Sequence, residues 1–169
     1  MQLLIVRHAV AEDREEFART GRDDGERPLT RSGRRRMERG ARGLRRVVPR
    51  IDVLATSPLV RAAQTAAIVA RAYDGATRET VNELLPSGRY KDFLRWLRAR
   101  HDARVVAAVG HEPYLSGLVT LLLTGKNDAP VIELKKGAAC LLDFAGDVRP
   151  GKAVLRWALT PGQLRRLRR

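Results

Sequence analysis

The feature that most constrains the fold is a repeated order of elements, in which a short apolar run ends at polar residues and a helix-like stretch follows. The runs are Leu3–Val6, Ile51–Ala55 and Arg104–Val109. Apolar runs of this length, bounded by turn residues, are typical of strands that are buried on both faces. Strands that alternate with helices form a mostly parallel sheet, because a parallel connection needs a crossover element. The sequence therefore predicts a three-layer α/β/α fold.

Towards the C-terminus the pattern changes, and two strand-like segments follow each other. The segments "AACLLDF" and "AVLRWAL" flank the polar loop "AGDVRPGK", which predicts an antiparallel hairpin. Such a pair is common at one edge of a parallel sheet. The other expected elements are a helix in "PLTRSGRRRMERGARGLRRVV" capped by Thr30 or Ser32, an Ala-rich helix with Ser57 as N-cap and Pro58 in its first turn, a short strand at Arg78–Val81, a helix at Phe93–Ala99, and a helix opened by Pro113.

Length and composition define the broad class of protein. The 169 residues, 44% of them apolar, predict a single domain over residues 1–169, with residues 161–169 as a solvated basic end. No apolar run reaches the roughly 20 residues of a membrane span. The N-terminus lacks the pattern of a secretory signal. Cys140 is the only cysteine and lies in an apolar run, which predicts a packed thiol in a cytoplasmic protein.

A formal net charge of +14 makes anions the natural partners of this chain. Phosphorylated proteins, nucleotides, polyphosphate and nucleic acid all fit such a field. A preference for arginine over lysine is also what a GC-rich genome produces, so the charge alone assigns no function. Aromatic residues make up 5% of the chain, too few for the stacking platforms of a single-strand binder, and no motif of nucleic-acid recognition is present.

The ends of the three predicted strands carry the residues that point to chemistry. Arg7 and His8 follow the first strand, His111 follows the third, and Arg61 lies in the first turn of the helix after the second. Ligands of open α/β sheets bind outside the carboxyl ends of the strands, so we expect these side chains to meet. Two arginines and two imidazoles without clustered carboxylates suit a phosphoryl group, whose oxygens arginine grips with a planar fork, and not a divalent metal. We expect neither a metal nor a cofactor.

Four motifs, "LIVRHAVA", "RPLTRSG", "SPLVRAAQTA" and "VGHEP", occur in this order and resemble the histidine phosphatase superfamily, which has the phosphoglycerate-mutase-like fold. The short chain and the stretch "NELLPSG" are most similar to the SixA branch, the protein-phosphohistidine phosphatases. The resemblance implies that His8 is transiently phosphorylated and that Arg7, Arg61 and His111 complete the phosphate pocket. It also implies that Arg27 of "RPLT" approaches the substrate.

Several other titratable residues are candidates for the acid that protonates the leaving group, or are expected to take no part. Glu83 lies where many relatives that cleave phosphate monoesters carry an acid, which protonates the leaving alcohol. It either serves as that acid or only pairs with an arginine of the pocket. Glu12 and Asp13, shortly after His8, are weaker candidates for the same task. His101 lies among charged residues away from any strand end, and we expect it to be exposed and uninvolved.

The resemblance and the chemistry of the leaving group together predict a metal-independent cytoplasmic phosphatase for protein phosphohistidine. Its P–N bond breaks to imidazole, which leaves far more readily than an alkoxide, so no strong acid is needed. The chain between Glu83 and His111 holds about one helix, too short for the lid with which mutase-like relatives cover a sugar phosphate. The expected partner is a phosphohistidine-bearing phosphotransfer or carrier protein. Two alternatives stay open: a phosphatase of the same superfamily for small phosphomonoesters, nucleotides or polyphosphate, and a non-catalytic binder of anions or nucleic acid.

Overall fold

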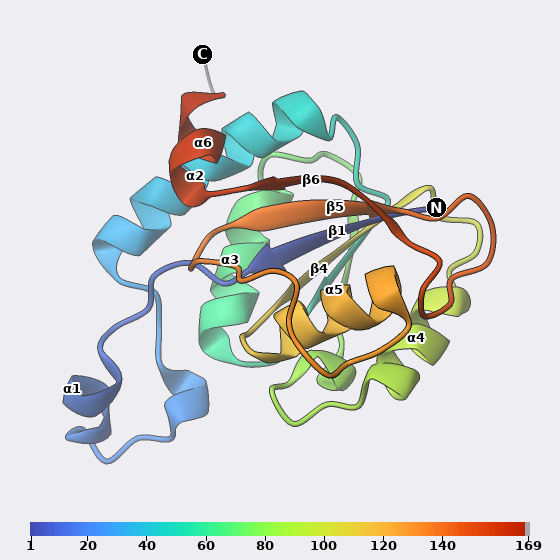
Figure 1. Cartoon of the computed structure of the whole chain (residues 1–169). Coiled ribbons are helices and arrows are strands. Elements are labelled where there is room, and N and C mark those ends of the chain that lie inside the picture. The colour runs from blue at the N-terminus through green and yellow to red at the C-terminus, as the bar shows by residue number, and fades with distance from the viewer. Residues whose placement is uncertain (168–169) are drawn as a thin grey trace.

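One sheet of six strands runs through the computed structural model, which describes residues 1–167 (Figure 1). The strands are β1 (Gln2–Arg7), β2 (Val53–Thr56), β3 (Thr77–Thr80), β4 (Val105–Gly110), β5 (Ala139–Asp143) and β6 (Val154–Leu159). Their order across the sheet is β3-β2-β4-β1-β5-β6. The strands β1 to β4 are parallel, whereas β5 and β6 pair antiparallel at one edge. The predicted mixed sheet with an antiparallel edge pair is confirmed.

Helices cover both faces of this sheet. They are α1 (Arg14–Ala18), α2 (Arg31–Val47), α3 (Val60–Ala70), α4 (Tyr90–Arg98), α5 (Tyr114–Thr124) and α6 (Pro161–Arg166), with short 3₁₀ helices η1 (Asp24–Glu26) and η2 (Asn82–Leu84). Alternate residues of β1 point to opposite faces, so Leu3 and Ile5 pack with α4 and α5, while Leu4 and Val6 pack with α2 and α3. The expected three layers are present.

The segment between β1 and α2 lies outside these layers and carries α1 and η1 (Figure 1). Asp13 caps α1, because its carboxylate accepts hydrogen bonds from the backbone N–H groups of Glu15 and Glu16. The segment returns to the body at Leu29, which bridges Ala11. None of the elements that the sequence predicts lies in this stretch.

The start of α2 packs directly on the chain that follows β1. Thr30 is the N-cap and accepts a hydrogen bond from the backbone of Gly33 at 2.9 Å, which confirms one of the two predicted caps. A Cβ atom at Gly33 would lie 2.1 Å from the carbonyl oxygen of Val10, so only glycine permits this approach. The motif "RPLTRSG" thus holds the segment that follows β1 against α2.

Two local predictions are wrong. Ser57 is not the N-cap of α3, which begins after Leu59. Residues 161–166 are not a solvated end but form α6, because Thr160 caps the helix with a capping box and Leu164 is fully buried against α2. The remainder of the predicted basic end, residues 168–169, lies outside the described residues.

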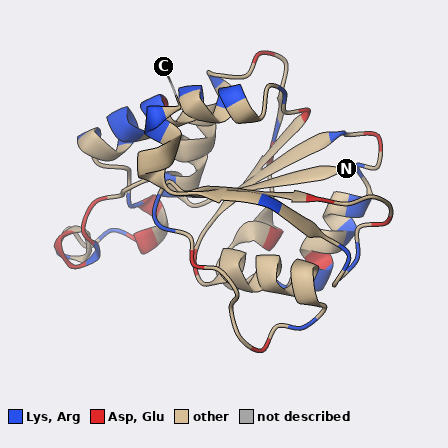
Figure 2. Cartoon of the chain, turned by 45° about the horizontal axis from the view of Figure 1, so that its top comes forward, with Lys and Arg blue, Asp and Glu red and all other residues tan. Residues whose placement is uncertain are grey.

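Charge and burial agree with the composition of the chain. Lys and Arg gather along α2 and α6, whereas Asp and Glu are frequent in the segment that carries α1 (Figure 2). Cys140 is fully buried on β5, as its apolar surroundings predict. Within residues 1–167, no helix combines the length and the apolar character that crossing a membrane requires.

Candidate active site

The carboxyl ends of three neighbouring strands bring the candidate residues together. The strands lie in the order β2-β4-β1, with Arg7 of β1 opposite Gly110 of β4 and Thr56 of β2 opposite Val109. One residue further along each strand stand His8, His111 and Ser57, so these three side chains share one edge of the sheet. Arg61 reaches the same edge from the first turn of α3.

His8 is held in one tautomer. Its Nδ1 lies 2.7 Å from the carbonyl oxygen of Ala9, and because a carbonyl only accepts, Nδ1 carries the proton and Nε2 keeps its lone pair. Burial lowers the pKa of His8 to about 4; the bond to Ala9 opposes this, and the charges of Arg61, Arg7 and Lys136 add to it. At neutral pH the ring is therefore uncharged and has a free nitrogen.

His111 stands next to His8, with ring centroids 5.1 Å apart. Its Nε2 lies 2.9 Å from the Ser57 hydroxyl, while its buried Nδ1 has no hydrogen-bond partner. Burial is the main cause that lowers the pKa of His111 to about 3, followed by the charges of His8 and Arg61. If Ser57 donates to Nε2, the proton of His111 sits on Nδ1, ready to donate to a ligand.

Arg61 is buried and anchored by the segment that carries η1. Its guanidinium donates to the backbone carbonyl of Asp24 at 2.9 Å and lies 3.2 Å from the Asp24 carboxylate. Arg27 shares that carboxylate through a 2.9 Å bond from Nε, and it also donates to the carbonyl of Glu12. Burial alone raises the pKa of Asp24, but the bond from Arg27 and the charges of Arg61 and Arg27 outweigh it, so the pKa lies below its usual value.

Arg7 is anchored by the chain that precedes β5. It donates to the carbonyl of Leu134 at 2.6 Å. The Leu134 backbone is held in turn by Glu112, whose other carboxylate oxygen accepts from the hydroxyl and backbone of Ser116. The glutamate in "VGHEP" therefore links the first turn of α5 to the segment that positions Arg7.

Three buried nitrogen atoms at this edge have no partner: Nε of Arg7, Nε of Arg61 and Nδ1 of His111. The arginine Nε atoms are donors, and His111 donates in the tautomer that Ser57 permits. Unsatisfied buried donors are rare because each one costs free energy. An oxyanion bound at this edge would offer acceptors to donors of this kind. Within residues 1–167, no group of three or more His, Cys, Asp or Glu side chains is placed to hold a metal ion.

Among the described residues, neither Glu83, the candidate acid, nor His101, which we expect to be uninvolved, is hydrogen-bonded or ion-paired to this cluster. Glu83 is half-buried on η2, and its carboxylate has no ion pair or hydrogen bond to any described residue. The carbonyl of the next residue, Leu84, lies close to Gly110, so η2 reaches the end of β4. His101 precedes β4, at the opposite edge of the sheet; it is exposed and lies 3.4 Å from Asp102.

Sequence reasoning missed four residues of the site: Asp24, Ser57, Glu112 and Lys136. Ser57 and Glu112 stand inside the quoted motifs, so their place beside Arg61 and His111 was a usable signal. Asp24 and Lys136 had no such signal, because Asp24 bonds Arg61 across a separation of 37 residues and Lys136 lies on a loop far from His8 in the sequence. The catalytic and substrate-binding roles of Arg7, His8, Arg27, Arg61, Glu83 and His111 stay predictions.

Comparisons with known proteins, by sequence and by structure, find similar proteins among histidine phosphatases. The family model described as "Histidine phosphatase superfamily (branch 1)" matches residues 3–85. An uncharacterized protein of Picosynechococcus sp. is 36% identical over 149 residues, which cover 82% of this chain and 87% of that protein. The structure of the protein histidine phosphatase SixA complexed with tungstate superposes with a TM-score of 0.82 and 26% identity, covering 97% of this chain and 99% of that one. The alpha-ribazole phosphatase of Shigella flexneri shares the fold, with a TM-score of 0.75 and 17% identity over 95% of this chain and 97% of that one.

Proposed function

This chain belongs to the histidine phosphatase superfamily, with a SixA-type fold, and on that premise we propose that it removes the phosphoryl group from protein phosphohistidine through a phospho-His8 intermediate. The observation that carries this proposal is the free Nε2 of His8 beside three unpaired buried nitrogens. A nucleophile with a lone pair and donors for three oxygens are what phosphoryl transfer needs.

In the first step, Nε2 of His8 attacks phosphorus in line, and the bond between phosphorus and the substrate imidazole breaks. The departing imidazole keeps the electron pair of that bond and takes up a proton from solvent. Arg7, Arg61 and His111 donate to the phosphoryl oxygens through their free nitrogens and stabilise the charge of the transition state. The proton on Nδ1 of His8, held by the Ala9 carbonyl, stabilises the positive charge that the phosphorylated ring acquires.

In the second step, a water molecule attacks phosphorus on the opposite side and releases inorganic phosphate. The P–N bond of phospho-His8 breaks, its electron pair returns to Nε2, and the water proton leaves to solvent or phosphate. The environment that lowers the pKa of His8 to about 4 favours this step, because it favours the neutral imidazole as leaving group.

Two observations support phosphohistidine over a sugar phosphate. The chain between Glu83 and His111 contains a single helix, α4, whose apolar residues are buried in the core on one face of the sheet. It therefore provides no lid for a small substrate. The carboxylate of Glu83 has no described partner that would fix it as a proton donor, and an imidazole leaving group does not require one.

A phosphomonoesterase is the second candidate. The position of Glu83, half-buried on the short helix that reaches the end of β4, favours it, since a carboxylic acid there would protonate an alkoxide. The two candidates share His8, Arg7, Arg61 and His111, and they differ only in the leaving group.

A panel of substrates tests the proposal. A phosphohistidine peptide, a phosphorylated carrier protein, an aryl phosphate, sugar phosphates and polyphosphate are offered side by side at equal concentration. We expect the highest kcat/KM with the phosphohistidine substrates. Efficient turnover of sugar phosphates without turnover of phosphohistidine would replace the first candidate by the second.

A further inference from the structure

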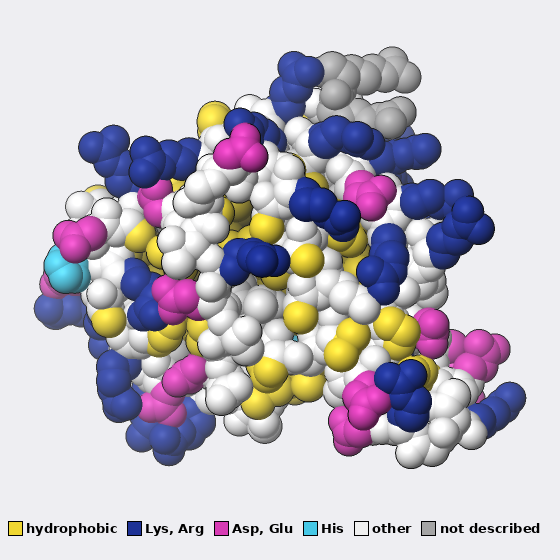
Figure 3. Space-filling model, turned by 180° about the vertical axis from the view of Figure 1, so that it is seen from behind, with side chains coloured by type: hydrophobic (Ala, Val, Ile, Leu, Met, Phe, Trp, Pro, Cys, Tyr) yellow, Lys and Arg dark blue, Asp and Glu magenta, His cyan; other side chains and the backbone are white. Residues whose placement is uncertain are grey.

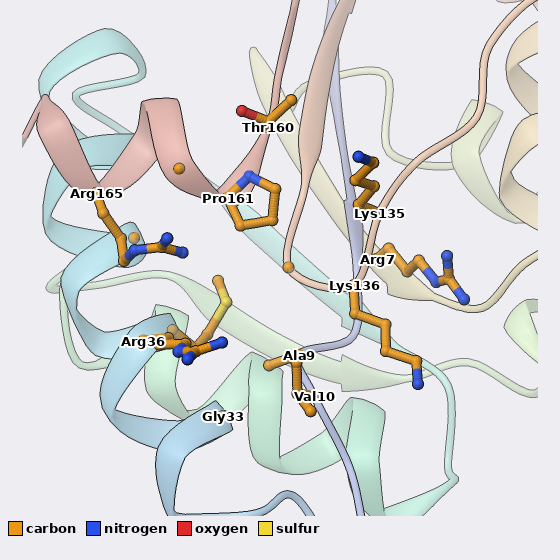
Figure 4. Close-up of a pocket in the computed structure, with 14 residues that line it drawn as sticks. Arg7, Ala9, Val10, Gly33, Arg36, Lys135, Lys136, Thr160, Pro161 and Arg165 are labelled. Carbon is orange, nitrogen blue, oxygen red and sulfur yellow. The ribbon is translucent and has the colours of Figure 1, made fainter.

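A hollow of about 560 Å³ lies next to the candidate site, between α2, α6 and the loop before β5 (Figure 4). We call it the basic pocket. Five cationic side chains line it: Arg7 at the end of β1, Lys135 and Lys136 on the loop, Arg36 on α2 and Arg165 on α6. They come from four separate parts of the chain, so only the tertiary structure assembles them.

The cations of the basic pocket lack counter-charges. No carboxylate lines the pocket, and none of the five has an ion-pair partner among the described residues. Some exposed arginines elsewhere are paired, as Arg22 is with Glu26 and Arg89 with Asp92, whereas the other arginines of α2 have no ion pair to a described residue. Lys and Arg are spread widely over the rear face too (Figure 3), so it is the concentration of unpaired charge around one hollow that is distinctive. Like charges around a hollow repel one another, and a bound anion relieves that repulsion.

The basic pocket is linked to the candidate site through Arg7, which lines it, whereas His8, Arg61 and His111 do not. Arg7, Ala9 and Val10 line it, and His8 belongs to the same stretch of chain. The charge of Lys136 is among those that lower the pKa of His8, so this ammonium also acts on the nucleophile. A substrate whose phosphoryl group meets Nε2 of His8 can therefore extend past Arg7 towards these cations.

Arg7 also lines a second, larger hollow of about 810 Å³ on its other side. That hollow is lined by Glu112, Asp128 and Glu133 as well, so it offers an anion no comparable field. A substrate with negative charge next to its phosphorylated residue is consequently favoured in one orientation only, with that charge towards α2 and α6.

We propose that the basic pocket binds a carboxylate side chain of the phosphorylated protein, adjacent to its phosphohistidine. This assignment rests on the proposed function, because a protein substrate supplies carboxylates and a sugar phosphate does not. Met37 and Val10 also line the pocket, and such apolar side chains suit the methylene groups of a glutamate presented from another molecule. Lysines and arginines around the rim then bind its charge.

The test uses a double variant on the far side of the pocket, Arg36→Gln with Arg165→Gln, which leaves Arg7 and Lys136 in place. Its matched control is Arg39→Gln with Arg42→Gln, because these exposed arginines lie on α2 but do not line the pocket. Both variants lose two positive charges, so any effect of net charge is equal. The substrates are a phosphohistidine peptide with glutamate on both sides of the modified residue and the same peptide with glutamine there. Inorganic polyphosphate is the third substrate.

We expect the pocket variant to raise KM for the glutamate peptide roughly three- to tenfold, the range for two ion pairs near a surface, with kcat unchanged. KM for the glutamine peptide should change less than twofold, and the control variant should leave both peptides alike. Equal effects on the two peptides, or an equal effect of the control, would overturn the assignment. An effect confined to polyphosphate would assign the pocket to a second phosphate instead.

The proposed function is tested separately by the wild-type protein in the same experiment. If it hydrolyses an aryl phosphate but neither peptide, the phosphohistidine proposal fails before any variant is compared, and the carboxylate assignment fails with it. If it hydrolyses both peptides with equal KM, the proposed function stands and only the assignment of the basic pocket is wrong.

Discussion

Two groups of polar side chains beyond the carboxyl ends of the parallel strands differ in how firmly hydrogen bonds orient them. At the ends of β1, β2 and β4, His8, Arg61 and His111 are buried, and each makes a hydrogen bond that fixes its orientation. On η2, beyond the end of β3, Glu83 is half-buried, and its carboxylate has no partner among the described residues.

This difference matches the two tasks of a phosphatase. Stabilising a transition state needs donors that are oriented before the substrate arrives, because reorientation costs free energy. Protonating a leaving group needs a fixed acid only when the leaving group is a poor one. We call His8, Arg61, His111 and Ser57 the fixed centre. We expect changes at the fixed centre to cost much activity and changes on η2 to cost little, and five experiments test this contrast.

The largest effect is expected for His8→Ala. Without the nucleophile, turnover should fall by at least about 10⁴-fold, since removing a covalent nucleophile leaves only binding and electrostatic contributions. Rapid-quench samples of the wild type should contain an acid-labile, base-stable phosphoenzyme that the variant lacks. His101→Ala, on the opposite edge, is the control and should be as active as the wild type. Full activity of His8→Ala would remove the basis of the proposed mechanism.

Arg61→Gln comes next, with an expected loss of about 10²- to 10³-fold in kcat, the usual effect of removing one donor to a transition-state oxyanion. Tungstate and vanadate should also inhibit the variant more weakly. Arg71→Gln, at the exposed end of the same helix, is the matched control. A similar loss in both variants would mean that general positive charge, and not the position of Arg61, matters.

Acid should destabilise the fixed centre. The pKa of His8 is lowered to about 4 and that of His111 to about 3, whereas both are near 6.5 in the unfolded chain, so protonation favours unfolding. Stability is complete above about pH 6.5 and decreases as the pH falls towards 4, each histidine changing the unfolding constant by about tenfold per pH unit. Thermal melts between pH 7 and 4.5 measure this, and the slope should be shallower in His8→Ala. Identical slopes would contradict the assignment.

Ser57→Ala should lower kcat roughly tenfold to a hundredfold, as loss of a residue that orients a functional histidine does. The hydroxyl that lies 2.9 Å from Nε2 of His111 is then missing, and if it donates to Nε2 in the wild type, its loss leaves the proton free to move between the two ring nitrogens. Nitrogen NMR shifts of His111 report the tautomer directly, and Ser57→Thr should restore both the tautomer and the rate. An unchanged tautomer in Ser57→Ala would show that Ser57 has no positioning role.

The smallest effect is expected for Glu83→Gln, which probes the other side of the comparison. Activity on phosphohistidine should stay within roughly tenfold of the wild type, a barrier change of at most about 1.4 kcal/mol. Activity on an alkyl phosphate should fall by about 10²- to 10⁴-fold if Glu83 protonates the alkoxide, and an aryl phosphate should be affected much less. A large loss on phosphohistidine would place Glu83 within the fixed centre after all.

The sequence by itself determined the layered architecture and the family. Apolar runs such as Leu3–Val6 indicate buried parallel strands. Successive side chains of a strand point to opposite faces of the sheet, and when helices cover both faces, all of these side chains must be apolar. The same pattern places Arg7, His8 and His111 at strand ends. Because the carboxyl ends of parallel strands lie on the same side of a sheet, the sequence predicts that these residues meet. Local rules were sufficient for strand direction, since parallel strands need crossover helices, but the order of the strands across the sheet is not among the predictions.

The tertiary structure alone decided what holds these residues and what lies beside them. The pairing of Asp24 with Arg61, the bond between Ser57 and His111, and the burial of Leu164 under α2 join segments that sequence spacing does not relate. Ser57-Pro58 was interpreted as a helix cap because capping preferences are local, whereas the nearby His111 ring competes for the same hydroxyl. The cations of the basic pocket likewise become one site only when α2, α6 and the loop before β5 pack together, because charge acts through distance in space and not through distance along the chain.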